Sequence, residues 1–314
     1  MATRTEERTR FAAKPGKLPR SAWFGVLRRT FSEFNEDEMT DWAAALTYYG
    51  ILAIFPALIA LVSILGLIGT SATKPLLDNL GSFAPGPAHQ ILANALHGLT
   101  QSRGGAGILF IVGLAGALWA ASGYIGAFIR ASNRIWDVEE GRPIWRILPL
   151  RIFVTVLMLL LLAASAFAVV VTGPLADRVG KLVGIGSAFV TVWDIAKWPV
   201  LVLVVSFMFT ILYYATPNVR HPGFRWLTPG GVLAVVAWMV VSAAFGVYVA
   251  NFGSYNKTYG SLGAIIIFLV WLWLSNVAIL LGAELNAEIA RGRQIEAGQP
   301  ADREPFLPPR REPS

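Results

Sequence analysis

Six long apolar stretches, bounded by charged or turn-forming residues, constrain this 314-residue chain more than any other feature of its sequence. About 18 or more consecutive apolar residues match the roughly 30 Å of membrane hydrocarbon at about 1.5 Å of rise per helical residue. The stretches cover residues 42–68, 106–129, 148–171, 198–215, 229–250 and 260–283. A helix satisfies its own backbone hydrogen bonds where lipid offers no partner. The sequence therefore predicts an all-α integral membrane protein with six transmembrane helices.

Composition agrees with a membrane protein. Hydrophobic residues make up 55% of the chain and charged residues 14%, against roughly 25% charged in an ordinary soluble domain. The chain has no cysteine, which removes disulfides, zinc–thiolate sites and cysteine nucleophiles from consideration.

The distribution of basic residues predicts the orientation. Of 26 Lys and Arg, 20 lie before the first span, in the second and fourth connections, or after the last span. The opposite face has five, and Lys197 lies at the start of the fourth span. By the positive-inside rule, both termini are expected in the cytoplasm, as six spans also require. Since topology and anionic lipid account for the net charge of +7, membrane lipids are the expected partners and nucleic acid is not.

The predicted organisation has three parts. Residues 1–41 are expected to form a cytoplasmic tail and an amphipathic interfacial helix, residues 42–289 the transmembrane domain, and residues 290–314 a disordered cytoplasmic tail rich in proline. The helix is indicated by apolar side chains at three- to four-residue spacing, and it either lies on the inner leaflet or packs under the bundle. Short amphipathic helices are also expected in the first external loop, residues 70–105. The apolar positions of the predicted N-terminal interfacial helix are Trp23, Phe24, Leu27, Phe31 and Phe34.

Polar groups inside the apolar runs are the candidates for a cavity or a gate. Tyr48 and Tyr49 lie in the first span, where Pro56 predicts a kink because it lacks a backbone N–H. Asn276 in the sixth span either lines a cavity or forms a hydrogen bond between helices, which is the commoner use of such a residue in lipid. The turn between the fifth and sixth spans adds Tyr255, Asn256 and Tyr259.

Glu284 ends the sixth apolar stretch, and a carboxylate there is expected to face protein or water rather than lipid. Arg130 or Arg134, at the cytoplasmic end of the second span, is its predicted ion-pair partner. The alternative is an interfacial carboxylate exposed to solvent. Buried charge is otherwise sparse, which argues against a proton relay of the usual kind.

Several motifs resemble the YihY/BrkB family of membrane proteins over residues 24–289. They lie at 43–49 with Phe55 and Pro56, at 119–122 with residues 130 and 133–136, and at 214–218, 255–264 and 281–288. The resemblance implies a six-helix inner-membrane protein with both termini cytoplasmic. It also implies association with virulence and serum resistance, suspected export of lipid or other envelope material, and an older ribonuclease label (ribonuclease BN).

The residues themselves do not favour an enzyme. A metal-dependent nuclease needs converging carboxylates or histidines, yet the only histidines are His89, His97 and His221, at separate places. No P-loop motif is present, so neither a catalytic residue nor a metal or other cofactor is predicted. A ribonuclease is thus the least favoured function.

Two functions remain open. The first is a transporter or exporter of lipid or other amphipathic envelope material. The second is a non-transporting scaffold that maintains envelope integrity. Either could involve a homo-oligomer or envelope protein partners.

Overall fold

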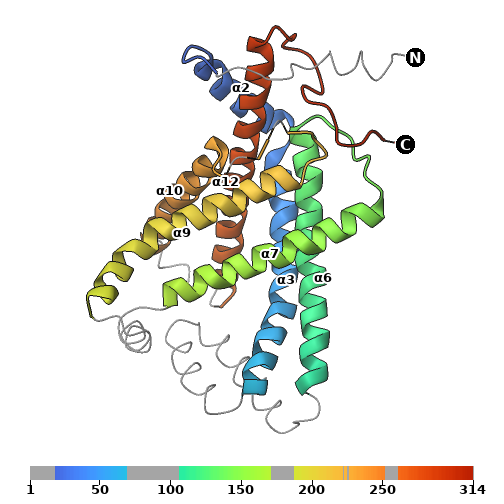
Figure 1. Cartoon of the computed structure of the whole chain (residues 1–314). Coiled ribbons are helices and arrows are strands. Elements are labelled where there is room, and N and C mark those ends of the chain that lie inside the picture. The colour runs from blue at the N-terminus through green and yellow to red at the C-terminus, as the bar shows by residue number, and fades with distance from the viewer. Residues whose placement is uncertain are drawn as a thin grey trace. The chain divides into compact units, whose positions relative to one another are not determined.

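The computed structural model describes residues 18–68, 106–170, 187–221, 223–224, 226–251 and 261–313 (Figure 1). Over these residues the regular secondary structure is all α-helical, with one isolated antiparallel bridge between Val219 and Pro309. The helices are α2 (Ala22–Glu36), α3 (Met39–Ile68), α6 (Ala106–Ile135), α7 (Ile144–Val170), α9 (Ser187–Ala215), α10 (Pro229–Asn251) and α12 (Ser261–Glu296).

Five helices in the described part of the chain are long and apolar enough to cross a membrane. The candidate spans are Ile111–Ile135, Ile144–Leu162, Ile195–Ala215, Pro229–Val249 and Ile265–Glu296. The remaining predicted span, residues 42–68, lies within α3, but the description of its side chains ends at Ala53. That span therefore stays a prediction, and the predicted helices of the first external loop lie outside the described residues.

The chain divides into two compact units. The larger unit comprises Met1–Thr47 and Ile125–Ser314, and the smaller comprises Tyr48–Tyr124. In the smaller unit, the ring of Tyr49 lies against Gly123, where an added Cβ would stand 2.9 Å from Tyr49 Cδ1. A glycine at this point in α6 thus makes room for an aromatic ring of α3.

In the larger unit, α10 and α12 come together where two glycines face each other. A Cβ on Gly230 would collide with the carbonyl oxygen of Gly282, and a Cβ on Gly282 would collide with that of Gly230. Small residues permit this close approach of two helix backbones, which is a common way for helices to associate in lipid. The contact explains why the motif at 281–288 contains Gly282.

Helix α2 packs across the C-terminal part of α12 (Figure 1). Val26 of α2 forms a small apolar core with Leu285 and Ile289 of α12. Of the five predicted apolar positions of α2, only Phe34 is buried, whereas the other four remain exposed. The helix therefore presents two apolar faces, one of which packs on α12.

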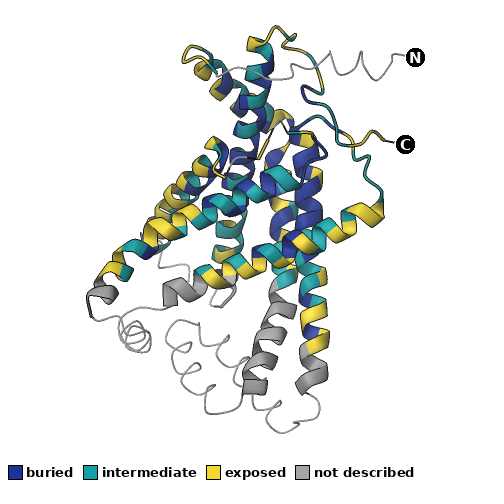
Figure 2. Ribbon diagram, in the orientation of Figure 1, coloured by how far each residue is buried: buried dark blue, intermediate teal, exposed yellow. Residues whose placement is uncertain are grey.

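Large apolar side chains are exposed along α7, α9 and α10, where the exposed residues are yellow in Figure 2. Such continuous apolar surface is unusual for a protein in water and typical of helices that contact lipid. Examples are Phe153, Leu160 and Leu162 of α7, Ile195, Trp198 and Leu203 of α9, and Val240 and Val247 of α10.

The C-terminal segment differs from its predicted disorder. Helix α12 continues through residue 290 to Glu296, and the chain beyond it is ordered to residue 313. Phe306 and Leu307 are buried, and Arg310 forms hydrogen bonds with the end of α9. Proline-rich composition suggested disorder, but proline also suits a segment of turns and bends that is anchored by its neighbours. Phe306, Leu307 and Arg310 supply those anchors.

Candidate functional site at the polar end of the larger unit

The candidate site lies where α2, the ends of α6, α9 and α12, the start of α10 and the C-terminal segment meet. We call this region the polar end of the larger unit. Its side chains form two groups of polar contacts and line one pocket.

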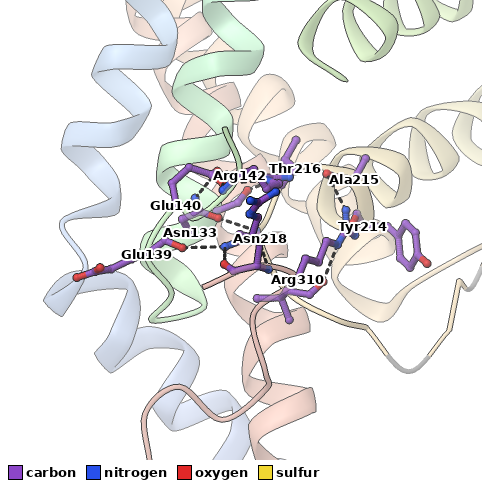
Figure 3. Close-up of polar contacts among 12 residues, drawn as sticks. Asn133, Glu139, Glu140, Arg142, Tyr214, Ala215, Thr216, Asn218 and Arg310 are labelled. Carbon is purple, nitrogen blue, oxygen red and sulfur yellow. Dashed lines mark hydrogen bonds and ion pairs between the residues drawn. The ribbon is translucent and has the colours of Figure 1, made fainter. Parts of the chain in front are cut away.

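The first group surrounds the C-terminus of α9 (Figure 3). Arg310 donates hydrogen bonds to the carbonyl oxygens of Tyr214 at 2.6 Å and Val219 at 2.8 Å, and Arg142 donates to that of Thr216 at 2.7 Å. Two guanidinium groups thus satisfy the carbonyl group of Tyr214 at the end of α9 and those of Thr216 and Val219 beyond it, and their charge complements the helix dipole.

Asn218 joins three segments at this place. Its backbone N–H donates to Asn133 Oδ1 at 2.8 Å, and its side-chain amide donates to the carbonyl oxygens of Glu139 at 2.9 Å and Arg311 at 2.7 Å (Figure 3). Glu140 accepts hydrogen bonds from Arg142 and Asn133, which hold the pKa of Glu140 below its usual value although burial opposes this. Asn133 and Asn218 belong to motifs that the family resemblance singled out.

The second group centres on Arg291 of α12, which is almost completely buried. Its guanidinium lies 2.5 Å from Glu33, 3.0 Å from Glu304, 3.3 Å from Glu288 and 3.5 Å from Asp137. One arginine therefore connects α2, the end of α6, α12 and the C-terminal segment. Sequence reasoning expected sparse buried charge and missed this group, because its members are far apart in the chain.

Asp37 and Asp137 are two carboxyl groups of this region that lie outside the spans and whose pKa is raised. Burial raises the pKa of Asp37 to about 7, although Arg134 opposes the shift. Burial, with the charge of Glu304, raises the pKa of Asp137 to about 6. Both carboxyls therefore bind a proton more tightly than an exposed aspartate does.

The predicted ion pair of Glu284 with Arg130 or Arg134 is not formed. Arg134 Nε instead lies 2.9 Å from Asp37 Oδ1, and Arg130 is exposed. Glu284 is 1% exposed, and its Oε2 has no hydrogen-bond partner among the described residues. The prediction failed because Asp37, in the turn before α3, lies closer to Arg134, and sequence spacing does not reveal that proximity. The alternative of a solvent-exposed Glu284 is wrong as well.

Each of the described cavity candidates makes its contacts within its own unit. Tyr48 is 61% exposed, and its ring meets that of Tyr49 edge to face at 5.4 Å. Asn276 is buried and donates a hydrogen bond from Nδ2 to Thr47 Oγ1 at 3.0 Å, which links α12 to α3. The side chain of Pro56 lies outside the described residues, as do Tyr255, Asn256 and Tyr259.

A pocket of about 100 Å³ lies between α9, α10, α12 and the C-terminal segment. Sequence reasoning missed it, although its walls include residues of the motifs at 214–218 and 281–288. The lining residues are Trp136, Thr210, Tyr213, Tyr214, His221, Gly223, Thr228, Pro229, Asn286, Ile289, Ala290, Arg293 and Leu307.

The start of α10 forms one wall of the pocket. Thr228 Oγ1 accepts a hydrogen bond from the backbone N–H of Gly231 at 3.1 Å, and Asn286 Oδ1 accepts one from that of Gly230 at 3.0 Å. Asn286 also donates to Thr228 Oγ1 at 3.0 Å. These contacts cap α10 and fix the positions of two polar lining residues.

His221 forms another wall. Its ring stacks on Tyr214 at 5.2 Å and meets Trp136 edge to face at 4.9 Å. Burial, with the charge of Arg310, lowers the pKa of His221 to about 4, so the imidazole is neutral at neutral pH. Its Nε2 is buried and has no hydrogen-bond partner within the described part of the chain.

Over the residues that the structure describes, no group of three or more His, Cys, Asp and Glu side chains is placed to hold a metal ion.

Long apolar helices with exposed apolar faces and an ion-paired end define a multi-pass membrane protein. The chain belongs to the family described as virulence factor BrkB, whose sequence profile matches residues 30–305. This agrees with the resemblance found from the motifs.

Named relatives are identical to this chain at about 30% of the matched positions. A ribonuclease-like protein, YfkH, from Bacillus subtilis (strain 168) is 31% identical over 87% of this chain and 98% of its own length. Membrane proteins designated UPF0761 are 32% identical in Alkalilimnicola ehrlichii and 30% identical in Aromatoleum aromaticum, over 86% and 87% of this chain. The matches cover only 60% and 65% of those two longer relatives. No solved structure matches the chain.

Proposed function

We propose that this protein is a multi-pass transporter or exporter of lipid or other amphipathic envelope material in the plasma (inner) membrane. The observation that carries the proposal is the pocket at the polar end, whose walls combine the aromatic rings of Trp136 and Tyr214 with the cationic Arg293. An amphipathic molecule presents the same combination of apolar and charged surface. The helices beside the pocket, α9 and α10, expose apolar side chains suited to lipid.

The proposed topology has six spans with both termini in the cytoplasm, so the polar end faces the cytoplasm. The 20 basic residues on one side of the predicted topology support this orientation. Helix α2 fits it too, because Phe24, Leu27 and Phe31 are exposed on a face distinct from the one that packs on α12. In this arrangement the exposed face lies in the inner leaflet, with Arg28 near the lipid headgroups.

The proposed role involves no chemical step on the cargo. Energy for directional movement would come from a gradient or from a partner protein, since the sequence contains no P-loop motif. The ribonuclease-like name belongs to the Bacillus relative and is not extended to this chain.

Reconstitution in liposomes tests the proposal. Vesicles of phosphatidylcholine with the purified protein would contain a trace of phosphatidic acid that carries a fluorophore on its acyl chain, and an impermeant quencher would report its movement between leaflets. We expect faster movement than in protein-free vesicles, with the increase reduced in Arg293→Gln and retained in Arg220→Gln. Arg220 is exposed on the connection that also carries His221, but it does not line the pocket. Equal rates with and without protein, under an imposed proton gradient as well, would contradict transport of this cargo.

A scaffold remains the second candidate, because one specific observation favours it. Asn276, a candidate cavity residue, forms a contact between helices. Polar residues inside spans would then serve packing, and the protein would hold copies of itself or other envelope proteins in place. Crosslinking in native membranes would show a defined protein partner in that case, while the liposome assay would show no movement.

A further inference from the structure

We propose that the pocket at the polar end binds an anionic headgroup, namely a phosphate or carboxylate carried by an amphipathic molecule. This inference rests on the proposed function for the nature of the cargo, and it assigns the part of the cargo that the protein recognises. A pocket of about 100 Å³ has room for a compact group of this kind. It is smaller than the roughly 300–1,000 Å³ of sites that enclose a whole drug-sized ligand.

Two opposite faces of α12 carry charges of opposite sign near its C-terminal end. At about 100° per residue, Asn286, Ile289, Ala290 and Arg293 share one face of the helix, and all four line the pocket. Glu284 and Glu288 lie on the opposite face. The described lining thus includes the cationic Arg293 and no carboxylate.

A second cation reinforces the first. The guanidinium of Arg310 lies 5.5 Å from the centre of the Tyr214 ring, which forms a wall of the pocket. Its charge is also one of the causes that lower the pKa of His221. The carboxylates of the Arg291 group are already engaged by that arginine or by Arg29. Arg310 also compensates the negative end of the α9 dipole, so Arg293 is the main charge in the pocket that favours an anion.

The start of α10 adds to the positive potential, and the neutral imidazole of His221, another lining residue, adds no charge. The 23-residue helix α10 begins at Pro229, which lines the pocket, so the positive end of its dipole lies there. The backbone amides of Gly230 and Gly231 already donate to Asn286 and Thr228. The start of α10 therefore attracts an anion through the helix dipole rather than through hydrogen bonds from those amides.

The rest of the lining suits the apolar body next to such a headgroup. Trp136, Ile289 and Leu307 supply apolar surface, and Leu307 comes from the C-terminal segment. The ordered segment is therefore a part of the site.

Binding by the purified full chain in non-ionic detergent tests the assignment. Native mass spectrometry would measure phosphatidic acid, phosphatidylcholine with the same acyl chains, and inorganic phosphate. We expect phosphatidic acid to bind at least about tenfold more tightly than phosphatidylcholine, and Arg293→Gln to remove this preference, whereas Arg293→Lys keeps most of it and Arg220→Gln all of it. Competition by inorganic phosphate would show that the free ion occupies the same site. Absence of competition, with the preference intact, would show that the site needs the headgroup attached to its chain.

Equal affinity of Arg293→Gln and Arg220→Gln for phosphatidic acid would overturn the proposal, as would equal binding of the two lipids by the wild type. If Arg293→Gln does not fold, Ala290→Glu provides the second test, because it adds a carboxylate to the same wall and glutamate is a good helix former. Unchanged binding by Ala290→Glu would also overturn the proposal. Headgroup binding without lipid movement in liposomes would support the site while contradicting transport, so the two failures are distinguishable.

Discussion

Substituting Arg291 by glutamine is expected to destabilise the protein more than any other loss of a single charge at the polar end. The Arg291 side chain is 5% exposed and lies within 4.0 Å of four carboxylates, Glu33, Asp137, Glu288 and Glu304. Removing one partner of a buried ion pair typically costs about 3–5 kcal/mol, because the other charge stays buried without compensation.

The geometry places Arg291→Gln near the lower end of that range. Glu288, with a side chain 2% exposed, keeps the contact with Arg29 at 2.5 Å, so it is not left alone. Glu304 is 57% exposed and loses little. The packing of the guanidinium on the Phe306 ring, at 5.0 Å, is also lost. We expect a decrease of about 3 kcal/mol in the free energy of unfolding.

Unfolding in mixtures of a non-ionic detergent and sodium dodecyl sulfate, followed by circular dichroism, measures this decrease. Arg220→Gln, an exposed control, is expected to change the stability by less than about 0.5 kcal/mol. Adding Glu33→Gln to Arg291→Gln is expected to recover about 1 kcal/mol or more, because Glu33 has no other ion-pair partner among the described residues and its charge is left uncompensated. A cost below about 1 kcal/mol for Arg291→Gln, with strictly additive effects in the double variant, would refute the reasoning.

Three further predictions concern packing, pH and helix contacts. Gly230→Ala should lower the melting temperature in detergent, because the new Cβ would collide with the Gly282 carbonyl, whereas Gly246→Ala, with open space around its Cα, should leave it unchanged or raise it. Since burial raises the pKa of Asp37 to about 7, the folded protein holds this proton more tightly than the unfolded chain. The resulting stabilisation is complete below about pH 4 and is lost as the pH rises through about 7, so wild type should lose stability relative to Asp37→Asn between about pH 5 and pH 8. Asn276→Leu should lower stability by about 0.6–2 kcal/mol while phosphatidic acid binding stays unchanged; altered binding would return Asn276 to the cavity candidates.

The membrane-crossing helices were predictable because a span has a purely local signature. Each needs only a sufficient run of apolar residues, and the run is visible without knowledge of its neighbours. The start of α9 was less well predicted: the expected span began at residue 198, but the helix begins at Ser187 and passes through Pro199. Lys197, expected at the mouth of the span, is buried inside the helix. Charged residues and prolines usually mark the end of a membrane-spanning helix, yet α9 contains both Lys197 and Pro199.

The polar end was not predictable, since it depends on residues far apart in the sequence. Asp37 and Arg134 are 97 positions apart, and their proximity is not encoded in the spacing of either segment. The ordered C-terminal segment was missed for the same reason, because Arg310 is stabilised by the distant end of α9. The motifs at 214–218 and 281–288 did mark the region, and the structure explains them by the cap on α9, the Gly230–Gly282 approach and the pocket wall.

Labelling of single cysteines tests most directly the claim that the polar end faces the cytoplasm. The natural chain has no cysteine, so Ser32→Cys, Ala301→Cys and Ser102→Cys each give one reactive site. We predict that an impermeant maleimide applied to intact cells labels only the cysteine at position 102, and that positions 32 and 301 react only after the cells are opened. Labelling of position 32 or 301 in intact cells would contradict the proposed topology, and with it the cytoplasmic position of the pocket.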